Sequence, residues 1–227
     1  EIKGIPYSEK LIKALKKLGY DVAFKELIMS DYGVPQNRKR FILFAIRNGN
    51  AKDFFERLEK NKENFLKQKE LYLKVNVSEA IGDLLQEYGE VQSQDSPKFM
   101  NGVYGPAQSS YQRYMRRNVQ GVPIPNSHRF AKPRKETKEL FVALMNASQE
   151  AIRITPKMNL VDGLKKRGVT PLKSKCICPT ITSIPDDFIH YKEPRIMTVR
   201  ECARIQSFTD DYIFLGNYTT GGSRRKT

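Results

Sequence analysis

A short run of amide and basic side chains lies near the start of the chain. Residues 36–40 read QNRKR and directly follow Pro35. An arginine side chain carries a rigid fork of N–H donors, which matches planar acceptors such as phosphate oxygens and base edges. These residue types therefore favour the binding of an anionic or base-like group. Residues 38–40 alone are interpreted equally well as a solvated basic turn, because short basic clusters are common.

Two apolar segments must position this run. Residues 23–28 precede it and residues 41–46 follow it, and both segments are short and rich in Phe, Ile and Leu. Such segments are typical of buried strands. Gly33 and Pro35 indicate a turn between them. The pattern therefore predicts two strands joined by a turn that presents the amides and cations at the mouth of a sheet.

A helix is predicted before the first of these strands. Ser8 is its expected N-terminal cap and Gly19 its expected stop. Helix, strand, turn and strand in this order are typical of an α/β unit. The apolar residues of the helix have the spacing of one helical face: Leu11, Ile12, Leu15 and Leu18.

The charge of the chain points to a polyanionic partner, with nucleic acid as the first candidate. The 227 residues carry a formal net charge of +15 and give a pI of about 9.7. No apolar run reaches the length of a membrane span, and the first residues lack the form of a signal peptide. The cations occur in separated groups, which favours a surface that follows phosphates. The groups are Arg113, Arg116 and Arg117; Lys132, Arg134 and Lys135; Lys165, Lys166 and Arg167; and Arg224, Arg225 and Lys226.

The cysteines favour neither a disulfide framework nor a metal site. There are three, Cys176, Cys178 and Cys202, an odd and sparse number that fits a reducing compartment. Cys176 and Cys178 could bind a metal as a pair. With only two histidines in the chain and no second cysteine pair, we interpret them as strand residues.

The middle of the chain predicts helices separated by loops. Residues 51–73 indicate one long amphipathic helix or a helix pair, and a second helical pattern begins at Ser78. Residues 90–101 are polar without periodicity and predict a loop. Residues 136–150 predict another helix, and residues 176–184 predict a strand.

Aromatic and basic residues are interleaved between residues 104 and 118. Tyr111 and Tyr114 lie among arginines, so this segment could place rings and cations on bases and phosphates. Packing within an amphipathic helix is favoured slightly, because tyrosine usually buries its ring. His128 is interpreted as a hydrogen-bonded structural residue, since no serine or cysteine partner is evident nearby.

A second block with a clear pattern covers residues 195–214, which read RIMTVRECARIQSFTDDYIF. Thr198 and Glu201 have the spacing of a capping box at the start of a helix. The block therefore has a sufficient structural role of its own. Its arginines are further candidates for phosphate or interdomain contacts: Arg195, Arg200 and Arg204.

The two blocks together resemble the DNA cytosine-5 methyltransferases. Residues 35–40 match the PQxRxR signature of that family. Residues 195–214 are similar to its RxLTxREcARlQsFPDdYxF block, with Thr209 in place of the usual proline. The matches occur in the family's order and cover the first and last quarters of the chain, whereas the middle matches more weakly.

The resemblance implies an α/β fold, the C-terminal part of a Rossmann-like methyltransferase domain plus a mixed α+β target recognition domain. Residues 1–48 would end the catalytic sheet, residues 49–175 would form the target recognition region, and residues 176–227 would return and pack a helix on the catalytic domain. The basic turn and the capped helix would then flank one surface. A bacterial restriction-modification context and a cytoplasmic, nucleoid-associated location are implied as well.

The family transfers a methyl group from S-adenosylmethionine to carbon 5 of a cytosine that is flipped out of double-stranded DNA. The resemblance implies that Arg40 reaches the carbonyl oxygen of the flipped base and that Arg38 orders the pocket and its phosphate. Gln36 and Asn37 would shape the loop beside the DNA. Basic clusters, including a glycine-containing loop at residues 159–175, add the other expected DNA contacts. These are Arg113, Arg116, Arg117, Lys165, Lys166, Arg167 and Lys173.

Three family motifs are missing from this sequence: the Pro-Cys nucleophile loop, the Glu-Asn-Val string and the Phe-x-Gly-x-Gly cofactor loop. In family order all three precede Glu1. We therefore expect a C-terminal portion that is inactive alone and whose main S-adenosylmethionine site lies in a missing N-terminal catalytic portion. The alternatives are a non-catalytic DNA-binding module and one subunit of a split methyltransferase. A transfer RNA methyltransferase is disfavoured, because residues 48–175 form a large recognition region.

Overall fold

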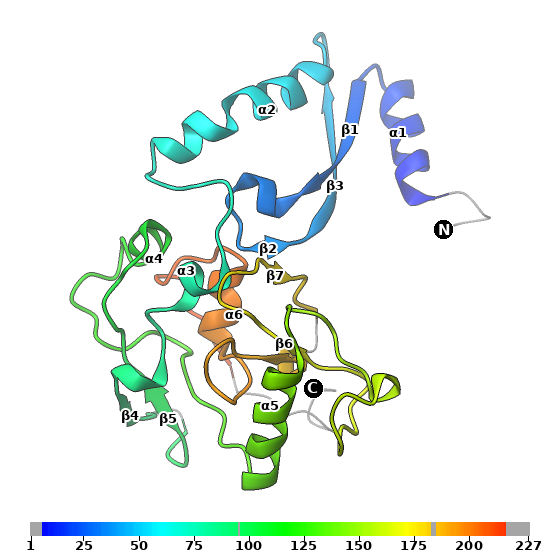
Figure 1. The fold of residues 1–227 in the computed structure, drawn as a ribbon. Helices are drawn as coiled ribbons and strands as arrows, with labels where there is room; N and C mark the ends of the chain where they lie inside the picture. Colours follow the sequence, from blue (N-terminus) through cyan, green and yellow to red (C-terminus); the bar gives the residue numbers. More distant parts are fainter. Residues whose placement is uncertain (1–5, 95, 183–184, 217–227) are drawn as a thin grey trace.

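The computed structural model describes residues 6–94, 96–182 and 185–216 (Figure 1). Its first part contains helix α1 (Tyr7–Lys17) and an antiparallel pair of strands, β1 (Asp21–Ile28) and β3 (Lys39–Ile46). The predicted helix and both predicted strands are confirmed. The predicted capping role of Ser8 is wrong, because Pro6 occupies the cap position and no side chain caps the helix.

Helix α2 (Lys52–Lys67) covers one face of the β1–β3 sheet (Figure 1). The ring of Phe44 stacks on that of Phe54, with 4.4 Å between the centroids. At the same interface, the ammonium of Lys25 lies 2.9 Å from a carboxylate oxygen of Glu59. The amphipathic pattern of residues 51–73 therefore corresponds to a single helix with an apolar side against the sheet.

The segment between β1 and β3 is more elaborate than a simple turn. It contains a 3-10 helix, η1 (Met29–Tyr32), and a short strand, β2 (Gln36–Asn37). Gly33 ends η1 with a φ of 80°, in the left-handed region that favours glycine. Its amide donates to the carbonyl of Leu73 at 3.1 Å, which ties the turn to the segment that follows α2.

The next part of the chain begins with helix α3 (Val77–Ile81), whose cap is Asn76. The structure therefore starts this helix before Ser78. A 3-10 helix, an antiparallel pair of short strands and helix α4 follow in chain order. They are η2 (Gln86–Tyr88), β4 (Glu90–Gln92), β5 (Met100–Gly102) and α4 (Ser110–Met115). The β4–β5 pair corrects the loop predicted for residues 90–101, since strands of three residues are too short to show alternation in the sequence.

The last part contains two helices and several very short strands. Helix α5 (Lys135–Ala147) confirms the helix predicted at residues 136–150. Of the strand predicted at residues 176–184, the described residues 176–182 form only β7 (Cys178–Pro179), and residues 183–184 lie outside the described ranges. Two parallel pairs connect this part, β6 with β8 and β2 with β7. The remaining elements are η3 (Pro156–Met158), β6 (Thr170–Pro171), β7 (Cys178–Pro179), η4 (Pro185–Asp187), β8 (Phe188–Ile189) and α6 (Val199–Ile205).

Two apolar clusters hold the second and third parts together. The larger one packs α3, α4 and α6 against β7, and it includes Ile81, Met115, Cys178 and Ile205. The smaller one packs α5 against the β6 and β8 region. Because the larger cluster joins residues more than a hundred positions apart, the second and third parts form one folded unit around α6 (Figure 1).

The mixed α/β content expected from the sequence is confirmed. In the described part of the chain every sheet has two strands, so assignment of β1 and β3 to a larger Rossmann-like sheet stays a prediction. The domain boundaries near residues 48 and 175 also stay predictions. No helix in the described ranges combines the length and the apolar character needed to cross a bilayer.

Candidate functional site

The QNRKR run is held against β7 by a parallel strand pair. Gln36 is in register with Cys178, and Asn37 with Pro179. Beyond the pair, the hydroxyl of Thr180 donates to the carbonyl of Asn37 at 2.9 Å. These contacts fix the backbone of the run immediately before its arginines.

The two arginines of the run have different surroundings. Arg38 is half-buried and donates from Nη1 to the carbonyl of Ile181 at 3.1 Å. Arg40, the second residue of β3, is also half-buried, and it donates from Nη1 to the carbonyl of its neighbour Lys39 at 2.8 Å in a solvent-exposed bond. Arg38 therefore fastens the loop to the segment after β7, while the guanidinium of Arg40 is positioned by a local bond.

The two amide residues also differ. Gln36 is 1% exposed, and its Nε2 has no hydrogen-bond partner. Asn37 is exposed and lines a hollow of about 290 Å³ together with Cys176 and Thr180. Gln36 thus shapes the loop from within, and Asn37 lies on its surface.

Helix α6 carries the capping box that the sequence predicts. The Thr198 hydroxyl accepts from the amide of Glu201, and the Glu201 carboxylate accepts from the amide of Thr198 at 2.7 Å. The same hydroxyl lies 2.8 Å from Nδ1 of His128, whose Nε2 lies 2.9 Å from the carbonyl of Leu84. Burial lowers the pKa of His128 to about 4, so the imidazole is neutral near pH 7. The structural interpretation of His128 is confirmed.

The Glu201 carboxylate is completely buried and paired. Arg195 donates to its two oxygens at 2.9 and 2.7 Å. Burial opposes ionisation of Glu201, but the charge of Arg195 outweighs burial and holds the pKa of the carboxyl below its usual value. The pair therefore remains ionised and fixes the turn before α6.

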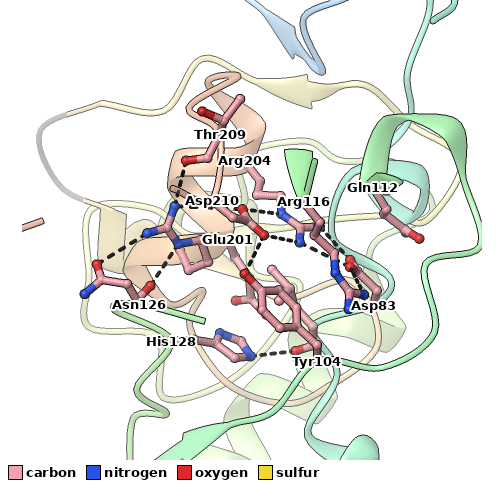
Figure 2. Close-up of polar contacts among 12 residues, drawn as sticks. Asp83, Tyr104, Gln112, Arg116, Asn126, His128, Glu201, Arg204, Thr209 and Asp210 are labelled. Atoms are coloured by element: carbon pink, nitrogen blue, oxygen red, sulfur yellow. Dashed lines mark hydrogen bonds and ion pairs between the residues drawn. The ribbon is translucent and has the colours of Figure 1, made fainter. Parts of the chain in front are cut away.

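Arg204 is the centre of a second buried ionic cluster (Figure 2). It donates to both carboxylate oxygens of Asp83, at 2.6 and 3.1 Å, and to both of Asp210, at 2.8 and 2.6 Å. The hydroxyl of Tyr104 donates to Asp210 at 2.7 Å. One arginine thus joins α6 to the end of α3 and to the chain after α6.

Arg200 is equally enclosed and satisfies backbone groups. Its guanidinium donates to the carbonyls of Asn126 at 2.8 Å, Tyr212 at 2.7 Å and Thr209 at 3.1 Å. The suggestion that the arginines of this block contact phosphate is therefore wrong. Their donors are directed at partners inside the protein: Arg195, Arg200 and Arg204 are at most 3% exposed.

The arginines of the α4 region do not behave as a single group. Arg116 donates to the carbonyl of Gly105 at 2.7 Å and stacks over the Tyr104 ring, 4.2 Å from its centroid. Arg117 stacks over Tyr114 in the same way, at 4.0 Å. Arg113 instead lines a cleft of about 670 Å³ between α3 and α4. Of the three, Arg116 is used within the protein, whereas Arg113 and Arg117 are exposed, and their predicted DNA contacts stay predictions.

Packing also explains the tyrosines of this segment. Tyr111 is 3% exposed, and its hydroxyl donates to the carbonyl of Arg204 at 2.7 Å. Tyr104 is held by Asp210, as described above. The favoured interpretation, in which the rings pack inside the protein, is confirmed for these two residues.

The basic loop before β6 is exposed as expected. Lys165, Lys166 and Arg167 are all exposed, and Lys166 donates to the carbonyl of Asp186 at 3.0 Å. Lys173 is different, because its ammonium donates to the carbonyl of Met145 near the end of α5 at 2.7 Å. Figure 1 shows the loop that precedes β6 and helix α4 on different sides of α6, so these two basic groups do not form one continuous patch.

The described ranges contain no metal-binding cluster, and two of the three cysteines lie in the interior. No group of three or more potential ligands is close enough together to hold an ion. Cys178 and Cys202 are buried, and burial raises the pKa of both thiols. A buried protonated thiol is a poor nucleophile, which agrees with the interpretation of these cysteines as structural residues.

Two kinds of supporting contact leave no recognisable pattern in the sequence. Thr180 holds the QNRKR loop from outside the run, and no local pattern marks it. Asp83 and Asp210 are the acidic partners of Arg204. Both contacts join segments that are distant in the chain, so they follow from the fold.

The fold of the chain is similar to that of one solved protein. A solved structure of a prophage-encoded E. coli protein, described as a DNA modification methyltransferase, matches it with a TM-score of 0.53 and 19% identity. The match covers 92% of this chain and 57% of that one.

The family can be stated from the sequence. The model of the C-5 cytosine-specific DNA methylases matches residues 5–226, and the chain belongs to this family. The Type II methyltransferase M.MthTI of Methanothermobacter thermautotrophicus is 29% identical, over 92% of this chain and 52% of the relative. M.DdeI of Desulfomicrobium norvegicum is also 29% identical, over 96% of this chain and 52% of the relative. The chain spans about half the length of these curated relatives.

Proposed function

We propose that this chain is the C-terminal, DNA-recognising portion of a DNA cytosine-5 methyltransferase, and that it is inactive without an N-terminal catalytic portion. The observation that carries the proposal is the fastening of the QNRKR run to β7, with Arg38 bound to the carbonyl of Ile181 and the Arg40 guanidinium, at the start of β3, held by a solvent-exposed bond to its neighbour. Such a loop can offer a guanidinium to a planar acceptor without reordering its backbone.

In this proposal the residues of the loop divide the work. Arg40 donates to the carbonyl oxygen of a cytosine that has been flipped out of the duplex. Arg38 keeps the loop and the nearby phosphate in order through its bond to Ile181. Gln36 supports the loop from its buried position, and Asn37 lies on the DNA side.

The exposed cations beyond the loop supply the nonspecific part of DNA binding. Lys165, Lys166 and Arg167 are available on the loop before β6, and Arg113 is available beside its cleft. Arg116 and Lys173 contribute chiefly by holding the shape of the recognition region, because they donate to carbonyls within the protein. Arg117 is exposed and remains a candidate for a DNA contact. A bacterial cytoplasmic, nucleoid-associated location belongs to the same proposal.

S-adenosylmethionine is the methyl donor that the family implies, and the residues of this chain do not fit it. No Phe-x-Gly-x-Gly loop occurs in the sequence, and no Pro-Cys pair supplies a nucleophile. The buried, protonated Cys178 and Cys202 cannot replace that nucleophile. Both functions therefore belong to the N-terminal catalytic portion, and we derive no step of the transfer from this chain alone.

The alternative is a DNA-binding module without any catalytic partner. The absence of the nucleophile motif from the sequence favours it as much as it favours the incomplete enzyme. The two differ in the role of Arg40, which needs a flipped base only in the enzyme.

Substitution of Arg40 tests the proposal in an enzyme completed with an N-terminal catalytic portion. We expect Arg40→Ala to lower methyl transfer from labelled S-adenosylmethionine by at least about a hundredfold, the scale of losing one donor to a developing charge. Duplex affinity should change by less than about threefold, because in this proposal Arg40 contacts the flipped base and its loss removes no phosphate contact.

Lys39→Ala is the matched control, since Lys39 is the adjacent cation and its side chain is 68% exposed. It should retain nearly full transfer. Full activity in Arg40→Ala, or equal losses in both variants, would remove the proposed role of Arg40.

A further inference from the structure

The loop before β6, residues 155–168, has a fixed base. Ile154 and Val169 form an isolated antiparallel bridge, in which the amide of each residue donates to the carbonyl of the other at 2.8 Å. The loop therefore leaves the fold and returns to it at one point, as in the compact surface loops that often carry function. Val169 is followed directly by β6, which pairs with β8.

The middle of this loop is anchored in an apolar cluster. Leu164 is 9% exposed and belongs to the cluster that packs α5 against the β6 and β8 region. Val161 packs against the same cluster. The exposed cations Lys165, Lys166 and Arg167 come immediately after Leu164. The loop therefore presents these cations next to a point that is held by the core.

A buried acid contacts the loop. Asp187, the last residue of η4, is 8% exposed. Its Oδ2 accepts from Nη2 of Arg153 at 3.1 Å, and the ammonium of Lys166 lies 4.0 Å from its Oδ1. Because Asp187 directly precedes β8, the strand pair that follows the loop also holds this carboxylate in place.

Arg153 reaches the carboxylate across the last residue of the loop. A Cβ added to Gly168 would lie 2.5 Å from Nε of Arg153, so the arginine side chain lies directly against the backbone of Gly168. Arg153 itself precedes Ile154, at the start of the loop. The pair of Arg153 and Asp187 therefore fastens both ends of the loop, in addition to the backbone bridge.

The sign of this charge requires an explanation beyond electrostatics. A carboxylate near exposed cations cancels part of their field, and it therefore opposes the binding of a phosphate chain if it acts only through its charge. Asp187 is nevertheless buried and bonded to a cation at the base of the loop. Lys165 and Arg167 have no hydrogen-bond or ion-pair partner in the described part of the chain, so their donors remain available to a ligand.

We propose that Asp187, through Arg153, is a positioning residue for DNA binding. It holds the loop before β6 in the conformation in which Lys165 and Arg167 reach the phosphates of duplex DNA. The inference rests on the proposed function and assigns phosphate contacts of the recognition region to this loop. A loop that is ordered before binding avoids the entropic cost of immobilising its side chains in the complex.

Asp187→Asn tests the proposal through the direction of its effect. The substitution removes a negative charge, which by electrostatics alone would strengthen the binding of DNA. It also removes the charged acceptor of Arg153, so we expect the Kd for a labelled duplex to rise by about fivefold to tenfold at constant salt. Asp162→Asn is the matched control, because Asp162 is exposed on the same loop. The control should leave the affinity unchanged or raise it.

A second pair of variants keeps the test valid if Asp187→Asn does not fold. Arg153→Gln changes the other partner, whose side chain is 47% exposed. Lys157→Gln removes the same charge from an exposed position on the loop. Arg153→Gln should weaken duplex binding at least about threefold more than Lys157→Gln does, because it also loosens the loop. Circular dichroism confirms that each variant is folded before its affinity is compared.

Digestion by trypsin without DNA examines the loop itself. Cleavage after Lys165, Lys166 or Arg167 should be faster in Asp187→Asn and Arg153→Gln than in the parent chain and in Asp162→Asn, since a loosened loop is cut more readily. Unchanged or tighter duplex binding by the folded Asp187→Asn variant, or equal cleavage in all four proteins, would overturn the proposal. A parent chain that binds no duplex would instead remove the proposed recognition role itself.

Discussion

The burial and the hydrogen-bond partners of a residue, more than its type, determine its role in this protein. Arginines that look alike in the sequence have different surroundings, because Arg204 is enclosed by carboxylates while the Arg40 guanidinium makes a solvent-exposed bond at the start of β3. An arginine that is fully buried needs partners for all of its donors, since an unpaired buried charge costs several kcal/mol. The number of donors that are satisfied inside the protein therefore separates a structural arginine from a ligand-binding one.

Arg204→Met should destabilise the fold severely. The substitution leaves Asp83 and Asp210 buried without their cation, and breaking such a cluster costs about 3–5 kcal/mol. Unfolding by urea, followed by circular dichroism, measures the change. Arg167→Met is the control, because this exposed residue should change the unfolding free energy by less than about 0.5 kcal/mol. Similar stability in both variants would show that the ionic cluster has little net weight.

The buried histidines should make the fold sensitive to acid. Burial lowers the pKa of His128 to about 4 and that of His190 to about 3, below the usual value of 6.5. Between pH 6.5 and 4 the unfolded chain therefore binds more protons than the folded one, so stability falls as pH falls. The contribution of His128 amounts to about 3 kcal/mol.

Urea unfolding at several pH values measures this dependence. His128→Gln removes one titrating group, so the fall in unfolding free energy between pH 6.5 and 4 should become shallower in that variant. An identical pH profile for the variant and the parent protein would contradict the assignment of a neutral, buried His128.

At the scale of elements, the sequence predicted what local chemistry determines. Helices α1, α2 and α5 and strands β1 and β3 follow from apolar spacing, and the start of α6 follows from its capping box. The strand β4 was predicted as loop, and the length of β7 was overestimated. Strands of two or three residues form only through their pairing partners, which the local sequence does not show. The contact between the QNRKR loop and β7 belongs to the same class, since it joins positions 140 or so apart in the chain.

Gly33→Ala should weaken the connection between η1 and the segment after α2. A left-handed φ costs a non-glycine residue about 1–2 kcal/mol, and an added Cβ would also lie 3.0 Å from a methyl carbon of Leu66. Gly163→Ala is the matched control, because Gly163 has a φ of 79° but no atom within 4 Å of an added Cβ. The difference in urea midpoint between the two variants isolates the Leu66 contact, and equal midpoints would show that the contact is absorbed without cost.

At the scale of the whole molecule, composition predicted the class of partner but not the shape of the surface. The net charge of +15 indicated a polyanion, and membership of the DNA methylase family agrees with that expectation. The cationic clusters proved unequal, since Arg116 and Lys173 bind carbonyls within the protein whereas Lys165 and Arg167 remain exposed. Which cations face outward depends on long-range packing, and the spacing of residues in the chain does not contain that information.

Duplex DNA binding should therefore depend steeply on salt, and unequally on the cations. Each phosphate contact contributes about 0.9 to the slope of log K against log salt. We expect the triple substitution K165A/R167A/K166A to reduce that slope by about 2 to 3. Fluorescence anisotropy of a labelled duplex over a range of salt concentrations measures this slope.

The triple substitution K52A/K60A/K67A removes the same charge from exposed positions on α2. Because α2 packs on the β1–β3 sheet and lies apart from the loop before β6 (Figure 1), this control should change the slope by less than about 1. Equal slopes for the two triple variants would mean that net charge alone drives binding, and that the loop before β6 makes no particular contact with the phosphates.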